Sequence, residues 1–306
     1  YRLEGRVPKL ILMSATIDVH KSAEFFKART GYPLDREIPI FVVPGRQYPI
    51  TDLQRGSSRV TDILSQIAAG RGDVLDFHPG VGEISQMRLA LDAHSHDAQI
   101  IPLHGKLSQE DQNKVHEPSG RPRIILSSNV SETSLTIRGV GTVVDGGLVR
   151  VSAWYGDEEI LELRNISRSD FQQRRARCGR ERPGFYINWG EPESQLRDGH
   201  WEILRVPCQS HTLRLIAAGE DPLALDFPHN PSLERRLADV RWLRDHGFIS
   251  DTSTPTPFGS LAATLPVEPR EAKIIKRALE LVATHPDLMG VAIDIAAISS
   301  VRDFRE

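Results

Sequence analysis

The sequence predicts an α/β protein: a parallel sheet covered by helices on both faces, followed by a helical C-terminal part. Over the first two thirds of the chain, short apolar runs rich in β-branched residues alternate with helical patterns. Such alternation is typical of parallel strands joined by crossover helices. After about residue 190 the pattern becomes helical. Because such sheets bind ligands at the carboxyl ends of their strands, we expect functional residues there.

The expected strands are the short apolar runs that stand between turn-forming or helical segments. They are KLILMSAT (9–16), DVLDF (73–77), AQIIPLH (98–104), RIILSS (123–128), TVVDGG (142–147) and FYINW (185–189). The helical patterns between them are RVTDILSQIAAG (59–70), GEISQMRLALDAH (82–94) and SQEDQNKVH (108–116). In the first of these, Val60, Ile63 and Ile67 recur at helical spacing, and Gly70 is expected to end the helix.

One segment breaks the alternation of strands and helices. LVRVSAWYGDEEILELRNI (148–166) has two strand-like halves around a turn at 155–157, which predicts a β-hairpin that projects from the sheet. Trp154 and Tyr155 lie near its tip. Their rings could stack on a base or pack within the turn, and the sequence leaves both interpretations open.

The C-terminal third predicts a small helix–wing unit and then a helical bundle. The helix expected over 230–247 has Asn230 as its N-cap, Pro231 at its first position and Gly247 just past its end. Its apolar stripe consists of Leu233, Leu237, Val240 and Leu243. A short wing is expected over 248–259, and two further helices over 271–285 and 287–301.

Composition limits the classes of function. The chain has 306 residues, 26% of them charged, and a formal net charge of −3. A general nucleic-acid binder would be basic, so any such binding must use a local patch. Cys178 and Cys208 fit no metal-binding or disulfide spacing, which favours a reducing, intracellular setting, and no run is apolar enough for a membrane span. We expect no metal site: His94 and His96 are interpreted as a solvated helix end.

The stretch QQRRARCGR (172–180) packs four arginines into nine positions. A solvated basic face is the ordinary interpretation of such a run. On a helix, however, Gln173, Arg177 and Arg180 would share one face, while Arg174 and Arg175 would point elsewhere. An amide and two guanidiniums on one face suit phosphate oxygens, so this stretch is a candidate phosphate site.

Two hydroxyl-rich segments give this stretch a context. SSNVSETSLTI (127–137) follows one expected strand, and MSAT (13–16) ends another. Together with QQRRARCGR they resemble the motifs of superfamily 2 helicases, and most closely those of the DEAH/RHA group of RNA helicases. In chain order the matches are LILMSATID (10–18) to motif III, VVPGRQYPI (42–50) to the interdomain linker, VLDFHPGVGEI (74–84) to motif IV, SSNVSETSLTI to motif V and QRRARCGR (173–180) to motif VI.

The resemblance covers nearly the whole chain and implies its domains. FGSLAATLPVEPREAKII (258–275) resembles the junction of the family's winged-helix and ratchet domains. The implied organisation is a remnant of a first RecA-like domain with linker (1–46), a second RecA-like domain carrying the hairpin (47–190), a winged-helix-like domain (191–270) and the start of a helical ratchet domain (271–306). The first residue is Tyr1 and the last stretch is helix-like, so we expect the chain to be an internal piece of a longer polypeptide.

For the nucleotide, the resemblance implies one role per matching residue. Gln173 would orient the attacking water, and Arg177 and Arg180 would be arginine fingers on the γ-phosphate. Ser134 would sense the nucleotide state and Thr136 would contact the ribose. A last group, Ser14 and Thr16, would couple hydrolysis to domain movement.

For RNA, the resemblance implies contacts to the backbone of a single strand. Ser128, Asn129 and Thr133 would donate to phosphate without reading sequence. The hairpin would wedge strands apart, and the terminal helices would close a channel over the single strand.

Asp145, at the end of an expected strand, would support the motif V segment. Asp76, inside an apolar strand, would be a paired buried carboxylate or face a cleft, and the first is favoured.

The chain departs from the family at three nucleotide-side positions. His116 stands where a phenylalanine usually stacks on adenine. Arg138 stands where an acidic residue often binds the ribose hydroxyls, and a guanidinium cannot accept from them. Ala176 replaces the first glycine of motif VI.

The function implied is that of the C-terminal part of an ATP-dependent RNA helicase, with a possible protein activator. The sequence contains neither the family's P-loop nor its D-E-A-H motif. ATP and Mg²⁺ would therefore require the missing first RecA-like domain, and we expect this chain alone not to hydrolyse ATP. The alternative is a degenerate helicase-like module that binds RNA or partner proteins without turnover.

Overall fold

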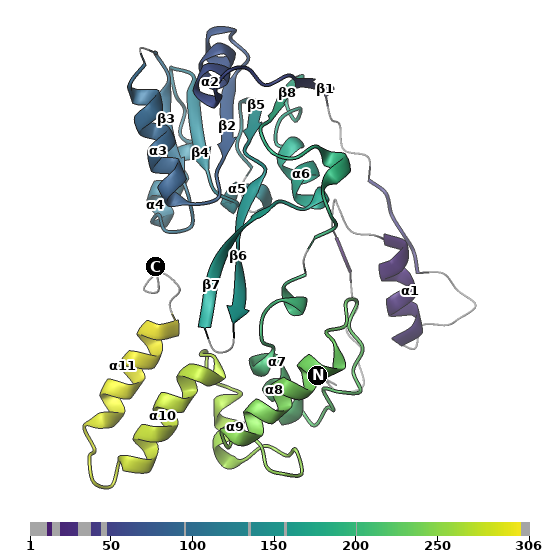
Figure 1. The fold of residues 1–306 in the computed structure, drawn as a ribbon, viewed down its shortest axis with the longest axis vertical. Coiled ribbons are helices and arrows are strands. Elements are labelled where there is room, and N and C mark those ends of the chain that lie inside the picture. The colour runs from purple at the N-terminus through teal and green to yellow at the C-terminus, as the bar shows by residue number, and fades with distance from the viewer. Residues whose placement is uncertain are drawn as a thin grey trace. The chain divides into compact units, whose positions relative to one another are not determined.

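The computed structural model describes residues 11–13, 19–29, 38–43, 48–94, 96–133, 136–155, 158–199 and 201–300. These divide into two compact units (Figure 1). The sheet unit comprises the described residues of Tyr1–Val149 and Asn165–Gly199, and the C-terminal unit those of Arg150–Arg164 and His200–Glu306. The helix α1 (Val19–Arg29), which the sequence interpretation missed, belongs to the first range.

The sheet unit is built on six strands, all paired in parallel. In spatial order they are β1 (Ile50–Leu53), β8 (Gly184–Asn188), β5 (Val140–Asp145), β2 (Asp73–Phe77), β4 (Arg123–Ser127) and β3 (Gln99–Leu103). The parallel sheet and five of the expected strands are therefore confirmed. Of the expected strand over 9–16 only 11–13 is described, and it is not a strand there. The edge strand β1 was missed.

Helices cover both faces of this sheet, as predicted. On one face α2 (Arg59–Ala68) and α3 (Val81–Asp92) contribute Ile63, Ile84 and Leu91 to a core with Val74 and the other strand residues of that face. On the other face Phe171 of α6 (Arg168–Arg175) and Val115 of the 3₁₀ turn η1 (Lys114–His116) pack with Leu75. Val74 and Leu75 point to opposite faces because side chains alternate along a strand.

Local signals explain where these helices begin and end. The Ser58 hydroxyl caps α2 by accepting from the Thr61 amide, and Gly70 follows the helix with a φ of 65°, the left-handed conformation that favours glycine. The helix α4 (Gln109–Asn113) begins at the Ser108 cap and continues into η1. A single turn, α5 (Val130–Thr133), follows β4.

The hairpin is confirmed as the strands β6 (Leu148–Tyr155) and β7 (Glu158–Asn165), which form a two-stranded sheet. By its contacts most of it, Arg150–Arg164, belongs to the C-terminal unit. The segment that returns to the C-terminal unit includes two 3₁₀ turns, at Glu193–Gln195 and Glu202–Leu204.

The C-terminal unit is otherwise helical. Its helices are α7 (Gln209–Ala217), α8 (Leu233–Asp245), α9 (Pro257–Ala262), α10 (Pro269–Leu281) and α11 (Leu288–Ser300). A core of Leu213, Leu243, Phe248 and neighbouring apolar residues joins α7, α8 and α9. Within the expected wing over 248–259, a turn is closed by an antiparallel bridge between Ile249 and Pro255, whereas the residues from Pro257 onwards belong to α9. None of the helices in the described parts of the chain has the length and apolar character that a membrane crossing needs.

The start of α8 was predicted wrongly. Its N-cap is Ser232, whose hydroxyl accepts from the Arg235 amide, and the helix begins at Leu233. Asn230 instead accepts from the Phe227 amide in the preceding turn, so its side chain is not available for capping. Leu233, placed in the apolar stripe, is 57% exposed because the first turn extends beyond the core. Gly247 past the end of the helix is confirmed, with a φ of 70°.

Candidate functional site

The arginine-rich segment is helical only in its first half. The helix α6 begins with a capping box between Ser167 and Asp170 and ends at Arg175. Ala176 is its C-cap, and Gly179 has a φ of 75°. The predicted single helical face of Gln173, Arg177 and Arg180 is therefore wrong. The chain turns at Gly179, which has this left-handed conformation, and the Gly179 carbonyl accepts from the Tyr48 amide just before β1, at 2.8 Å.

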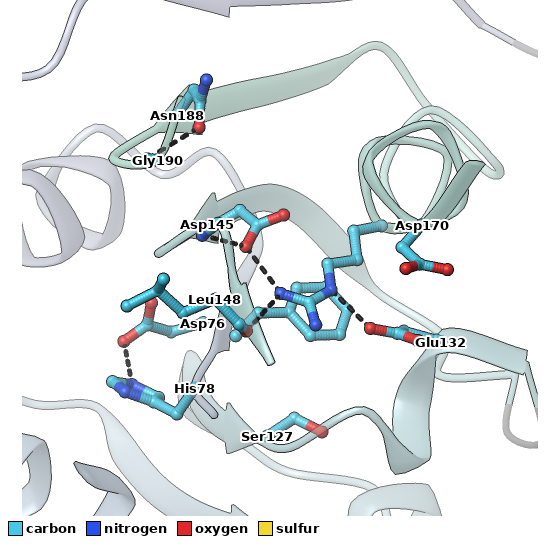
Figure 2. A network of polar contacts seen from close by, with 12 residues as sticks. Asp76, His78, Ser127, Glu132, Asp145, Leu148, Asp170, Asn188 and Gly190 are labelled. Carbon is cyan, nitrogen blue, oxygen red and sulfur yellow. Dashed lines mark hydrogen bonds and ion pairs between the residues drawn. The ribbon is translucent and has the colours of Figure 1, made fainter. Parts of the chain in front are cut away.

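Arg174 forms the centre of a buried polar cluster at the carboxyl end of β5. Its side chain is fully buried. It donates to Glu132 of α5 at 2.5 Å, to Asp145 at the end of β5 at 2.9 Å and to the Leu148 carbonyl at 3.3 Å; in Figure 2 the dashed lines from these three labelled residues meet at one guanidinium. The guanidinium also lies over the Phe77 ring, 4.8 Å from its centroid. Arg174 thus joins the motif VI helix to the motif V segment.

Asp145 supports the motif V segment through this cluster. Besides Arg174, it accepts from the Gly147 amide at 2.8 Å and from the Tyr186 hydroxyl at 3.2 Å. Burial, together with the charges of Asp170 and Asp145, raises the pKa of Glu132 against the opposing effect of Arg174. For Arg174 itself, the burial penalty is outweighed by Asp145 and Glu132, which raise its pKa. Two carboxylates therefore share one buried guanidinium, whose charge opposes the cost of burying both of them.

The two arginine-finger candidates lie close enough for their charges to interact. Arg177 is buried at 8% exposure. Burial, followed by the charge of Arg180, lowers the pKa of Arg177 to about 10, against the opposing effect of Glu132. Arg180 is exposed and its Nε donates to the Ala176 carbonyl at 3.1 Å. Gln173, half-buried, lies on α6 itself. A buried arginine beside a second cation is a good site for an anion such as phosphate.

A cavity of about 530 Å³ brings together the residues expected at the base and ribose. His116, Thr136 and Arg138 all line it. It lies where β2 and β4 begin, at Asp73 and Arg123, and so at the amino ends of these strands. This group therefore lies at the end of the strands opposite to the carboxyl ends, where ligands of such sheets were expected to bind. Ser134 lies outside the described residues.

Arg123 builds this cavity, and the sequence interpretation missed it. Its guanidinium pairs with Asp73 at 2.6 Å and donates to the carbonyls of Val115 and Arg138, both at 2.7 Å. One side chain therefore fixes the turn that carries His116 and the backbone that carries Arg138. The only signal in the sequence was an acidic and a basic residue at the starts of two adjacent strands.

The predicted RNA-binding donors lie near the carboxyl end of β4, at the end of the strand opposite to the cavity. Ser128 follows β4 and its amide donates to the Leu103 carbonyl at 3.0 Å. Asn129 is exposed, and its carbonyl accepts from the Glu132 amide at the start of α5. Thr133 ends α5, and nothing is described of its side chain. Ser14 and Thr16, the predicted coupling residues, lie outside the described residues.

Asp76 is a paired buried carboxylate, as favoured from the sequence. It is fully buried, forms an ion pair with Arg59 of α2 and contacts His78 Nε2 at 2.6 Å (Figure 2). Burial alone would raise the pKa of Asp76, but Arg59 and His78 hold it below its usual value. The sequence did not predict Arg59 and His78 as the partners of Asp76.

Within the described ranges no three His, Cys, Asp or Glu side chains gather as a metal site. His94 Nδ1 lies 2.9 Å from the Ala90 carbonyl near the end of α3.

Both cysteine thiols are expected to be unreactive in the folded chain. Burial raises the pKa of Cys178 and of Cys208 to about 11. At pH 8 the thiolate is the reacting species, so both should react with a disulfide reagent about a hundredfold more slowly than ordinary cysteines. The measurement is the labelling rate of the native chain against the same chain in concentrated urea. Equal rates in the two states would contradict this assignment.

Comparison with known proteins agrees with the motifs. A model of the helicase conserved C-terminal domain matches residues 58–182. An ATP-dependent RNA helicase HrpA homolog of Haemophilus influenzae is 33% identical over 97% of this chain, and the probable ATP-dependent RNA helicase DHX34 of Homo sapiens is 31% identical over 96%. The chain spans 24% and 27% of the lengths of these two relatives.

The fold is also shared with a helicase of known structure. The crystal structure of the Escherichia coli DEAH/RHA helicase HrpB superposes with a TM-score of 0.80 and 26% identity, covering 95% of this chain and 37% of that one. Its likeness extends over the sheet unit and the helical unit alike, since it covers almost the whole chain. The ordered motifs, the matched domain, the relatives and the shared fold together identify the chain as a member of the DEAH/RHA-type superfamily 2 helicases, corresponding to the C-terminal part of their helicase region.

Proposed function

We propose that this chain supplies the C-terminal half of the ATP site and the RNA-backbone contacts of an ATP-dependent RNA helicase, which couples nucleotide hydrolysis to movement on single-stranded RNA and to duplex unwinding. The observation that carries the proposal is the Arg174 cluster. It ties the segment of the arginine fingers, α6 and 176–180, to the segment of the RNA donors, Ser128–Thr133, through Glu132 and Asp145. A shift of either segment must therefore disturb the other.

The domains follow from the same resemblance. The second RecA-like domain would comprise 47–190, a winged-helix-like domain 191–270 and the start of a ratchet domain 271–306, with 1–46 as the remnant of the first RecA-like domain and its linker. ATP would lie between the two RecA-like domains. As the resemblance implies, Mg²⁺ would be held by residues of the first one. Ser14, Thr16, Gln173, Ser134 and Thr133 keep their proposed roles in this arrangement.

The cavity supports a nucleotide base and ribose with altered contacts. His116 offers a smaller ring than phenylalanine, and Arg138 offers a donor where the ribose hydroxyls would usually meet an acceptor. His116→Ala should raise KM for ATP about three- to tenfold, the value of one aromatic contact, with little change in kcat. His116→Phe should restore or lower KM. Measured in the full-length protein, a KM that is the same in all three proteins would remove His116 from the site.

The second candidate function is a helicase-like module that binds RNA or partner proteins without ATP turnover. The observation in its favour is that Arg138 and His116, both departures from the family pattern, line the same cavity. The two functions are separated by phosphate release from the full-length protein with single-stranded RNA present. Release above background supports the helicase. RNA binding without phosphate release supports the module and contradicts the proposal.

A further inference from the structure

Both ends of the β6–β7 hairpin are joined to the sheet unit by the chain, but most of the hairpin makes its contacts with the C-terminal unit. The chain leaves the sheet unit after Val149 and re-enters it at Asn165, yet Arg150–Arg164 groups with the C-terminal unit by its contacts. The atoms that make these contacts therefore decide with which of the two units the hairpin moves.

The main attachment is an arginine between two tryptophans. Arg270, in the first turn of α10, places its guanidinium carbon 4.8 Å from the ring centroid of Trp154 on β6 and 5.3 Å from that of Trp242 on α8. A second attachment lies two residues earlier on the same strand, where Arg205 Nη1 donates to the Ser152 carbonyl at 2.6 Å. Ala153, between these two residues, is buried.

Arginine suits this position better than lysine. Its planar, weakly hydrated guanidinium can face aromatic rings on both sides while keeping its charge. Trp242 is itself held in place, since His246 stacks on it with centroids 4.1 Å apart. The carboxylate of Asp239, one turn before Trp242 on α8, interacts with the charge of Arg270. The guanidinium therefore lies on a fixed aromatic surface of α8, and Trp154 of the hairpin packs against it.

We propose that Arg270 is a positioning residue for strand separation: by linking Trp154 to Trp242, it fixes the β6–β7 hairpin to the C-terminal unit. The hairpin then stays with this unit when the sheet unit moves during the hydrolysis cycle. The hairpin exposes Ile160, Leu161 and Leu163, which a displaced base pair can contact. This inference rests on the proposed helicase function only for its consequence, because the attachment itself can be measured without any activity.

The attachment is tested by hydrogen exchange of the β6 and β7 amides in the 306-residue chain. Arg270→Ala should speed their exchange about tenfold, the loss expected for a partly desolvated cation–π contact, and leave β2, β4 and β5 unchanged. Arg270→Lys should lie between. The matched control is Arg277→Ala on the same helix, whose partner is the exposed Glu280. Trp154→Leu leaves α10 intact and should reproduce the effect, so unfolding of α10 cannot account for it. Unchanged hairpin exchange in Arg270→Ala would overturn the proposal.

The consequence is tested by comparing unwinding with hydrolysis in the full-length protein. Arg270→Ala should lower the number of base pairs separated per ATP hydrolysed by about tenfold, while RNA-stimulated ATPase stays within about twofold. Arg270→Lys should recover part of the yield. A parallel fall of unwinding and ATPase would overturn the positioning role. A wild-type protein that hydrolyses no ATP would instead contradict the proposed function, and the exchange experiment would still decide the attachment.

Discussion

Replacing Arg177 by alanine in the full-length protein is expected to lower kcat for RNA-stimulated ATP hydrolysis about a thousandfold, the lower range for removing an arginine finger. The structure gives a reason beyond the motif. Arg177 is held buried beside Arg180, and burial with that second charge lowers the pKa of its guanidinium to about 10. The fold thus keeps a cation where its charge is disfavoured, and an anion arriving there relieves the penalty.

Arg177→Ala removes a charge that burial and Arg180 disfavour in the folded chain, so it should cost less stability than Arg174→Ala. Arg177→Lys should remain strongly impaired, since an ammonium cannot reproduce the fork of a guanidinium. The matched control is Arg175→Ala two residues earlier, whose side chain pairs with Asp52 at 2.8 Å and should leave kcat within about twofold. Comparable rates for wild type and Arg177→Ala would remove Arg177 from catalysis.

The largest loss of stability is expected for Arg174→Ala, about 3–5 kcal/mol in the free energy of unfolding. The substitution leaves the fully buried Asp145 without its cation and removes the ion pair of Glu132. It also removes the contact with the Phe77 ring and the hydrogen bond to the Leu148 carbonyl. Urea denaturation of the 306-residue chain measures the loss.

A double-mutant cycle separates the orphaned charge from the lost packing. Glu132→Gln removes one of the two carboxylates, so Arg174→Ala should cost less in that background than in wild type. Arg175→Ala, on the same helix, removes a partly exposed ion pair with Asp52 and should cost only about 0–1 kcal/mol. If Arg174→Ala and Arg175→Ala shift the urea midpoint equally, the cluster does not stabilise the sheet unit as described.

The parallel sheet could be read from the sequence because its strands are buried on both faces. DVLDF and RIILSS are short, each contains three apolar residues, and they correspond to β2 and β4, which are almost entirely buried. The edge strand β1, ITDL, has only four residues and exposes Thr51 and Asp52, so its pattern carries no comparable signal. After the end of α6, the Gly179 carbonyl accepts from the Tyr48 amide, which is far away in sequence, and no local pattern contains this contact.

Residues of the candidate site could be predicted from the sequence only where they occupy a position of a family motif. Thr136 and His116 line one cavity, but Arg123, which builds it, bonds Asp73 from fifty positions away. Arg174 was expected merely to point elsewhere, whereas it is the buried partner of Glu132, forty-two positions earlier. Long-range pairs of this kind arise from the order of strands in the sheet, which periodicity and composition do not encode.

Arg174 also provides a structural link through which ATP binding and RNA binding could be coupled. Glu132 lies in the helical turn after Ser128 and Asn129, and Asp145 ends β5, which is separated from β4 by β2. Because one guanidinium satisfies both carboxylates, a movement of α6 that brings Arg177 to a phosphate must carry along, or break, the bond to the RNA-side segment. Coupling of the two ligands is expected to follow from this shared partner.

We expect the residues at the amino ends and at the carboxyl ends of these strands to serve one RNA-dependent ATPase. The most direct test is the rate of phosphate release by the full-length protein with and without single-stranded RNA, in wild type, Arg175→Ala and Arg177→Ala. Such an ATPase should be clearly stimulated by RNA in wild type and in Arg175→Ala, and not at all in Arg177→Ala. Tight RNA binding by a wild-type protein that releases no phosphate above background would contradict it.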